Sequence, residues 1–315
     1  MSGRTTLSPS WLRRRIVLRQ LVLIVTLGIL VAACSAPPAG HKAALPSSAS
    51  RSTTSTTTAP TATTTIAPTT TTVAPTTQPS NTEGSLPATT STSPTTSTAE
   101  NLKQLFGKVW QQIPTTSRVV ALTFDAGANG NGVPAILSTL RSAGVPATFF
   151  LTGGFTKSFP DLARSIVQGG YRVGDHTVDH PHLPTLSDAM AAAEVADAAA
   201  TITSATGASP VPLFRFPYGD SDARTLTVVN DLGYVAVGWT VDTLGWEGSS
   251  AGITAASIVA RVIAGLRPGE IVLMHVGSNP NDGSTLDADA LASVIGSIKA
   301  AGYSFVTLDA LVGDG

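Results

Sequence analysis

Between residue 100 and residue 315 the chain alternates short apolar runs with longer amphipathic ones. Short apolar runs are typical of buried strands, and longer runs with apolar residues every three or four positions are typical of helices that pack on one face. The runs that predict strands are 119–124, 147–151, 172–174, 211–214, 234–237, 270–274 and 303–306. The runs that predict helices are 134–143, 160–168, 188–203, 223–232, 255–264 and 287–301. This alternation predicts a parallel α/β fold, either an incomplete barrel or a doubly wound sheet.

The first 34 residues have the organisation of an export signal. Arginines precede an apolar stretch at 21–31, which is too short to span a bilayer comfortably. The stretch ends in Val-Ala-Ala-Cys, which resembles the bacterial lipobox, whose cysteine becomes the lipid-modified first residue of the mature protein. We therefore expect residues 1–34 to be a lipoprotein signal peptide. Cys34 would then carry a lipid anchor on the outer face of the bacterial cell membrane; an uncleaved signal anchor and a small buried cysteine are the alternatives.

Residues 35–99 are dominated by Thr, Ser, Pro and Ala and contain almost no aromatic or large aliphatic side chain. Such a segment cannot bury enough apolar surface to offset the entropy lost on ordering. We expect a disordered stalk between the anchor and residues 100–315. Its many hydroxyl side chains suit O-glycosylation.

The charge balance of residues 101–315 narrows the choice of partner. This part contains 12 Lys and Arg against 18 Asp and Glu, and a surplus of acid repels polyanions. Nucleic acids and anionic membrane surfaces are therefore poor candidates, and a neutral sugar polymer suits the domain better. The only expected membrane contact is the lipid on Cys34, and the sequence does not indicate an oligomeric state.

Polar residues follow the ends of most predicted strands. In parallel α/β barrels the active site gathers at the carboxyl ends of the strands. The residues at these positions are Asp125, His176, Arg215, Trp239, Asp242 and His275. So many chemically active side chains at strand ends predict an enzyme.

Five segments around these residues carry a family resemblance. They read LTFDAG at 122–127, DHTVDHP at 175–181, RFPY at 215–218, DTLGW at 242–246 and LMH at 273–275. In this order they resemble the motifs T-F-D-D-G, H-[ST]-x-x-H, R-x-P-Y, D-x-x-D-W and L-x-H of the polysaccharide deacetylases (NodB-homology domains, carbohydrate esterase family 4). The resemblance covers nearly all of residues 100–315. It implies a distorted (β/α) barrel with seven or eight mostly parallel strands.

The second motif contains the candidate metal ligands. His176 and His180 are four positions apart, so one helical turn after the strand would point both imidazoles at a common ion. Two imidazoles suit zinc, and two solvated loop histidines are the alternative. The resemblance implies that His176 and His180 hold a divalent metal, with Zn²⁺ as the default.

The resemblance also implies a catalytic role for four residues. Asp125 would be the general base that removes a proton from a metal-bound water, and Arg215 would keep it ionised and oriented. His275 would be the general acid that protonates the departing amine. Asp242 would orient or charge-stabilise His275.

Three further positions correspond to substrate-binding residues of the family. The backbone N–H of Tyr218 would help to bind the oxyanion that develops during the reaction. Trp246 and Leu273 would form an apolar slot for the acetyl methyl group. Taken singly, both of these apolar residues are also ordinary core residues.

The sequence departs from the family pattern at two positions. Ala126 stands where the family has a second, metal-binding aspartate, so water, Asp125 or another loop residue would have to complete the site. The nearby candidates are Asn129, Asn131 and Asp179. Gly245 stands where the fourth motif often has a polar residue, which weakens the expected support of His275. The departure at Ala126 predicts weaker or differently shaped metal binding.

Three functions fit this pattern. The first is removal of N-acetyl groups from a cell-wall polysaccharide, with peptidoglycan as the leading substrate. The second is an O-acetyl esterase or a deacetylase of chitin or xylan oligomers, and the third is a glycan-binding pseudoenzyme. An α/β-hydrolase esterase finds little support, because none of the predicted strands leads directly into a G-x-S-x-G turn.

Overall fold

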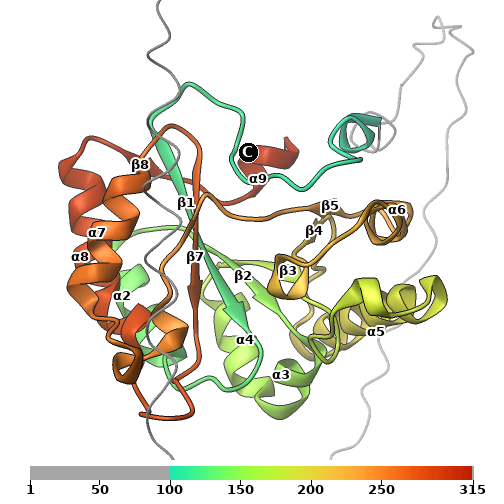
Figure 1. Cartoon of the computed structure of the whole chain (residues 1–315), viewed down its shortest axis with the longest axis horizontal. Helices are drawn as coiled ribbons and strands as arrows, with labels where there is room; N and C mark the ends of the chain where they lie inside the picture. Colours follow the sequence, from blue (N-terminus) through green and yellow to red (C-terminus); the bar gives the residue numbers. More distant parts are fainter. Residues whose placement is uncertain (1–99, 314–315) are drawn as a thin grey trace, which may run out of the picture. The chain divides into compact units, whose positions relative to one another are not determined.

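A parallel sheet lies at the centre of residues 100–313, the part of the chain that the computed structural model describes (Figure 1). Its strands are β1 (Val119–Ala126), β2 (Thr148–Leu151), β3 (Arg172–Asp175), β4 (Leu213–Phe214), β5 (Val235–Ala236), β6 (Val241–Asp242), β7 (Glu270–His275) and β8 (Ser304–Phe305). They pair in the order β5-β4-β3-β2-β1-β7-β6, and β8 pairs with the start of β1. The named strands are all paired in parallel. The sheet is curled and open, which confirms the predicted distorted barrel.

Helices cover the sheet in two groups. The helices are α2 (Val133–Ala143), α3 (Gly153–Ser158), α4 (Pro160–Gln168), α5 (Asp188–Thr206), α6 (Ala223–Asp231), α7 (Ala255–Gly265), α8 (Leu286–Ala300) and α9 (Asp309–Val312). Helices α2, α7 and α8 pack together beside β1 and β7, and α3, α4, α5 and α6 form a second group (Figure 1). Local signals fix their ends: the Ser187 side chain caps α5 by accepting from the Met190 N–H, and Gly144 ends α2 with φ 62°.

The alternation of side chains along β1 directs one carboxylate to the interior of the sheet. Val120, Leu122 and Phe124 belong to the apolar cluster between the sheet and the helices, whereas Ala121 belongs to a second cluster on the opposite face. Successive residues of a strand point to opposite faces. Asp125 therefore shares the face of Ala121 and reaches the carboxyl end of the sheet on its inner side.

All seven predicted strands and all six predicted helices are present, with ends that differ by a few residues. Strand β6 and the short helices α3 and α9 were not predicted. Asp242 is therefore the last residue of β6, at the opposite edge of the sheet from β5. The predicted signal peptide, the stalk and Cys34 lie outside the described residues.

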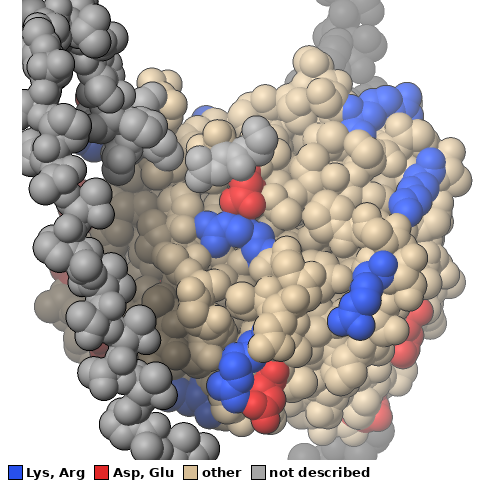
Figure 2. All heavy atoms as spheres, turned by 180° about the vertical axis from the view of Figure 1, so that it is seen from behind, with Lys and Arg blue, Asp and Glu red and all other residues tan. Residues whose placement is uncertain are grey.

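The described surface carries no large block of a single charge on the face shown in Figure 2, where Lys, Arg, Asp and Glu are scattered among uncharged side chains. None of the helices in residues 100–313 combines the length and the hydropathy that crossing a bilayer requires.

One buried carboxyl group lies at the amino end of β7, away from the polar residues described above. Glu270 is fully buried; its Oε2 accepts from the Arg267 N–H, and its Oε1 has no hydrogen-bond partner among the described residues. Burial raises the pKa of Glu270 to about 7, against a smaller opposing effect of Arg267. The folded protein therefore binds this proton more tightly than the unfolded chain does.

We expect Glu270→Gln to stabilise the protein at pH 8 and to have little effect at pH 5. The pKa of Glu270 is higher in the folded state than in the unfolded chain. The free energy of unfolding therefore falls as pH rises from the usual pKa of a glutamate, 4.5, to about 7, and it stays low above that pH. Removing the charge should recover about 2 kcal/mol, or roughly 4 °C in melting temperature, at pH 8. Thermal unfolding at both pH values measures the difference, with Glu247→Gln as the control. Equal melting temperatures for Glu270→Gln and the parent protein at pH 8 would contradict this expectation.

Candidate active site

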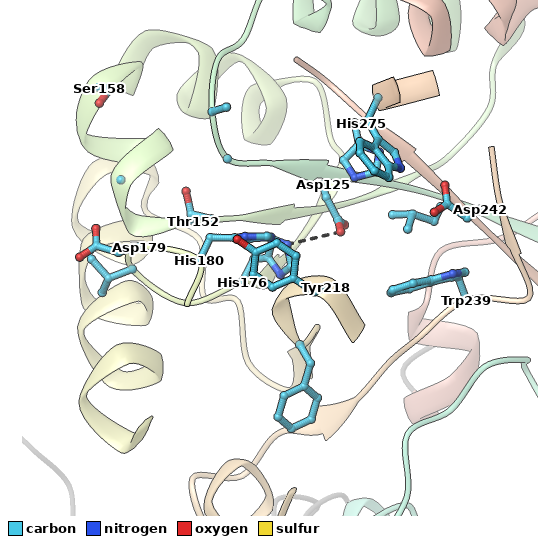
Figure 3. Close-up of a pocket in the computed structure, with 17 residues that line it drawn as sticks. Asp125, Thr152, Ser158, His176, Asp179, His180, Tyr218, Trp239, Asp242 and His275 are labelled. Carbon is cyan, nitrogen blue, oxygen red and sulfur yellow. Dashed lines mark ion pairs between the residues drawn. The ribbon is translucent and has the colours of Figure 1, made fainter. Parts of the chain in front are cut away.

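A cavity of about 740 Å³ opens at the carboxyl ends of the strands (Figure 3). Most of the residues predicted for the site line it. These are Asp125, His176, His180, Tyr218, Asp242, Trp246, Leu273 and His275. Arg215 lies behind this lining, directly after β4, and is fully buried. The fold thus brings together residues from five separate segments of the sequence.

Arg215 holds Asp125 from inside the sheet. Its Nη1 donates to Asp125 Oδ1 over 2.7 Å, and its Nε and Nη2 donate to the backbone oxygens of Val237 and Gly238. Burial raises the pKa of Asp125, but the charge and hydrogen bond of Arg215, together with nearby histidines, outweigh that effect and hold the pKa below its ordinary value. Asp125 is therefore a carboxylate at neutral pH.

The two ring nitrogens of His176 have different partners. Nδ1 lies 2.8 Å from the backbone oxygen of Arg215, and because a carbonyl oxygen only accepts, this nitrogen carries the proton. In the neutral ring, Nε2 then presents its lone pair toward Asp125 Oδ2, 3.4 Å away (Figure 3). Burial lowers the pKa of His176, and the charge of Asp125 only partly opposes this. Two electron-pair donors that face each other favour a bound cation.

His180 approaches His176 through an irregular turn. The two ring centroids are 4.7 Å apart in an edge-to-face arrangement. The helical turn predicted here is wrong, because Thr177 and His180 have positive φ angles of 67° and 59°. Burial, with a contribution from the charge of His176, lowers the pKa of His180 to about 4. The imidazole is therefore neutral at neutral pH and has a lone pair that can bind a metal ion.

Two carboxyl groups that the sequence did not reveal hold this turn. Asp175 Oδ1 accepts from the Thr177 N–H, and Glu194 Oε2 on α5 accepts from the N–H groups of Val178 and Asp179. The interactions fix the backbone that carries both histidines. Nothing near 176–180 in the sequence points to Glu194, because its contact depends on how α5 packs.

His275 ends β7 on the opposite side of the cavity from the two histidines (Figure 3). Leu273, two residues earlier on the same strand, lines the cavity beside it, and the Trp246 ring lies edge-on to the imidazole at 6.4 Å. Burial lowers the pKa of His275, but three carboxylates (Asp287, Asp125 and Asp242) more than offset this and raise it above its ordinary value. His275 can therefore hold a proton at near-neutral pH, as a general acid requires.

Asp242 makes no hydrogen bond to His275, so of its two predicted roles only charge stabilisation remains. Its Oδ1 accepts from the backbone N–H of Leu244, and the carboxylate acts on His275 only through its charge. The acid in contact with His275 is Asp287, whose Oδ2 accepts from the His275 backbone N–H at 2.8 Å and lies 3.8 Å from Nδ1. The hydrogen bond from the Leu244 N–H ties Asp242 to the loop that follows β6 instead.

Exposed aromatic side chains stand at the mouth of the cavity. Tyr218 is 60% exposed and Trp246 is 49% exposed. The Tyr218 ring stacks on His182 at 4.0 Å and meets His180 edge-on at 4.5 Å. The backbone of Tyr218 is left-handed, with φ 60° and ψ 4°. Exposed flat rings at a cavity mouth suit the apolar faces of sugar rings.

Comparisons with known proteins agree with this geometry. The family model described as polysaccharide deacetylase matches residues 112–237. The peptidoglycan-N-acetylglucosamine deacetylase of Listeria monocytogenes is 34% identical over 199 residues, which cover 63% of this chain and 40% of that protein. A chitooligosaccharide deacetylase of Azorhizobium caulinodans is 30% identical over 197 residues, which cover 60% of this chain and 92% of that protein. This chain belongs to the polysaccharide deacetylase family.

A solved structure of the family supports the fold assignment. A CE4-family pseudoenzyme from Bacillus anthracis is similar with a TM-score of 0.61 and 27% identity, covering 67% of this chain and 71% of that one. The chain matches only about 40% of the length of the Listeria protein.

Polysaccharide deacetylases of this family are generally metal-dependent, and the donor atoms here fit a cation in part. Nε2 of His176 and the neutral ring of His180 are available, whereas Ala126 is fully buried in the helix-side apolar cluster and does not line the cavity. Across residues 100–313 no group of three or more His, Cys, Asp or Glu side chains forms a complete metal site. The residues fit a two-histidine site with open positions.

The other candidates for a third ligand are engaged elsewhere or lie apart. Asn129 Oδ1 accepts from the Ser278 N–H, and Asn131 Nδ2 donates to the Ser278 hydroxyl. The Asp179 carboxylate points away from the two histidines toward α3 (Figure 3). No side chain of these three replaces the aspartate that the family has at position 126.

Proposed function

We propose that this protein hydrolyses N-acetyl groups of a cell-wall polysaccharide, with peptidoglycan amino sugars as the substrate. The observation that carries the proposal is the pair of groups on opposite sides of one cavity: a carboxylate held ionised by Arg215, and a histidine whose pKa is raised. A binding protein has no use for such a matched base and acid. Similar relatives named as peptidoglycan-N-acetylglucosamine and chitooligosaccharide deacetylases support the same reaction class.

The chemistry follows from these two residues. Asp125 takes a proton from water as the water oxygen bonds to the acetyl carbonyl carbon, which gives a tetrahedral intermediate. His275 then donates a proton to the amide nitrogen while the C–N bond breaks, and acetate and a free amine leave. An amide needs this proton because an unprotonated amine leaves poorly. The apolar surfaces of Leu273 and Trp246 suit the acetyl methyl group.

We propose Zn²⁺ as the divalent metal of this site, held by His176 and His180. When bound, it would supply a Lewis acid that lowers the pKa of a water ligand and polarises the acetyl carbonyl. The Nδ1–H group of His176 donates a hydrogen bond to the Arg215 backbone oxygen. Metal-binding histidines usually make such a hydrogen bond with the ring nitrogen that does not bind the metal. With two protein ligands in place of the usual three, we propose weak binding.

We further propose that the protein acts outside the cytoplasm, tethered through a lipid on Cys34. The sequence of the first 34 residues and the stalk-like composition of residues 35–99 support this. A tether of that composition would let the domain reach wall glycans beside the membrane.

The full-length protein should release acetate from N-acetylated peptidoglycan fragments faster than from chitooligosaccharides or O-acetylated xylan. Acetate release is measured with each substrate, with and without added Zn²⁺, and bound zinc is measured by calorimetry. His176→Ala should lose both zinc binding and metal-stimulated turnover, because it removes the buried donor nitrogen. His182→Ala removes a nearby histidine that is not a proposed ligand and should keep zinc binding.

The results separate the three functions considered. Preference for O-acetylated xylan would indicate an esterase. Preference for chitooligosaccharides would indicate that chitin oligomers, and not peptidoglycan, are the substrate. Glycan binding without acetate release, whatever metal is added, would overturn the catalytic proposal and leave a pseudoenzyme.

A further inference from the structure

Gly245 and Asp287 occupy neighbouring space behind the cavity. Gly245 begins the short 3₁₀ helix 245–247, and Asp287 lies in the first turn of α8. A Cβ atom placed on Gly245 would lie 2.5 Å from Asp287 Cγ and 2.7 Å from its Oδ2, distances that side-chain atoms do not adopt. Gly245 does not have a positive φ angle. The residue is therefore small because of the space that Asp287 fills, and its backbone conformation is open to other residues.

Asp287 is a buried carboxylate whose one potential cationic partner among residues 100–313 is His275, with 3.8 Å between Asp287 Oδ2 and His275 Nδ1. Its side chain is only 3% exposed, and it does not line the cavity. Its Oδ1 accepts from the Thr243 hydroxyl at 2.6 Å, and its Oδ2 accepts from the backbone N–H of His275 at 2.8 Å. Burying a carboxylate is costly unless it is hydrogen-bonded or paired. The nearest positive group available to it is the imidazole of His275.

The Nδ1 atom of His275 lies close to the Asp287 carboxylate. It is buried without a hydrogen-bond partner among the described residues, and Asp287 Oδ2 lies 3.8 Å away. A small rotation of either side chain would bring the two atoms into hydrogen-bond range. The other titratable groups that interact with His275 are Asp125, Asp242, His176 and His180, which lie on the cavity side. Asp287 approaches His275 from the side away from the cavity, where substrate does not reach.

We propose that Asp287 is the positioning residue for His275 and that it takes the place of the side chain missing at Gly245. It keeps the proton of His275 on Nδ1, which leaves Nε2 to carry the proton that is donated to the amide nitrogen, and it stabilises the imidazolium. Thr243 and the His275 backbone N–H hold the carboxylate in this position. The inference rests on the proposed deacetylase function and adds a residue from a different element, α8, to the site.

The test exploits the competition for space between positions 245 and 287. Asp287→Asn should lower kcat about 100-fold or more with little change in KM, because it removes the charge and keeps the shape. Asp289→Asn, in the same helical turn but exposed, should leave kcat unchanged. Gly245→Asp alone should be damaging because of the clash. Gly245→Asp combined with Asp287→Ala should recover at least 10-fold over Asp287→Ala, because the carboxylate returns from the other side.

A spectroscopic readout separates this proposal from the proposed function. The protonation of His275 is followed by NMR of its ring nitrogens in the full-length protein, in the parent, in Asp287→Asn and in Asp289→Asn. The pKa of His275 should fall by at least one unit in Asp287→Asn alone, and the high-pH limb of the kcat profile should shift to lower pH with it. An unchanged pKa overturns the proposal even if the protein deacetylates. A shifted pKa in a protein that releases no acetate upholds the contact and overturns the proposed function instead.

Discussion

Asp125→Asn is expected to reduce acetate release by about 10³-fold or more while the protein stays folded. An amide keeps the size of the carboxylate and still offers Oδ1 to Arg215 Nη1. Its NH₂ group can donate to the lone pair on His176 Nε2, which faces this position. The variant therefore preserves the contacts and removes the base, and loss of a general base costs about 10²–10⁴-fold in rate.

The comparison that makes this result specific is Asp231→Asn, at the exposed end of α6, which should retain full activity. Circular dichroism and the melting temperature establish that Asp125→Asn is folded. Activity within 10-fold of the parent protein would mean that another group accepts the proton from water.

Arg215→Met is expected to destabilise the protein by about 3–5 kcal/mol, the largest stability effect of any single change considered. The guanidinium is fully buried and donates to Asp125, Val237 and Gly238. Methionine fills part of the volume but leaves Asp125 as a buried charge without its partner. The pKa of Asp125 should rise as a consequence, because burial then acts unopposed by that charge. Urea unfolding monitored by fluorescence measures the loss.

Two further variants test whether the unpaired buried charge of Asp125 causes the loss of stability. Arg164→Met breaks the exposed ion pair with Asp161 and should cost less than about 1 kcal/mol. Adding Asp125→Leu to Arg215→Met should restore part of the lost stability, because no unpaired charge then remains. If the double variant is less stable than Arg215→Met alone, the buried charge is not the source of the loss.

The strands and helices were largely predictable because their periodic patterns are long. Strand β6 has a single apolar residue, Val241, between Thr240 and Asp242, and helix α3 begins with two glycines, so neither produces an apolar pattern. Those glycines have a tertiary cause: a Cβ atom on Gly153 would lie 3.3 Å from Val178 Cα. Close approach to the turn that carries the histidines overrides local propensity there.

The polar ends of the strands predicted the lining of the candidate site, but not the groups that support it. Asp125, His176 and His275 could be found because parallel strands bring their carboxyl ends together. Asp287 and Glu194 could not, because both are acidic residues within helical patterns and resemble ordinary surface positions. Their contacts depend on how α8 and α5 pack, which a single sequence does not encode in any short motif.

The loops around the cavity contain residues in unfavourable backbone conformations. The four non-glycine residues with positive φ among the described residues are Thr177, His180, Tyr218 and Leu244, and all of them belong to loops at the cavity. Each such residue raises the energy of the folded state by about 1–2 kcal/mol. Selection for robustness alone would have placed glycine or asparagine at these positions. With threonine, histidine, tyrosine and leucine there instead, the rim of the cavity lowers the stability of the folded state while its loops keep one shape. We expect selection for thermal tolerance to change these four positions first.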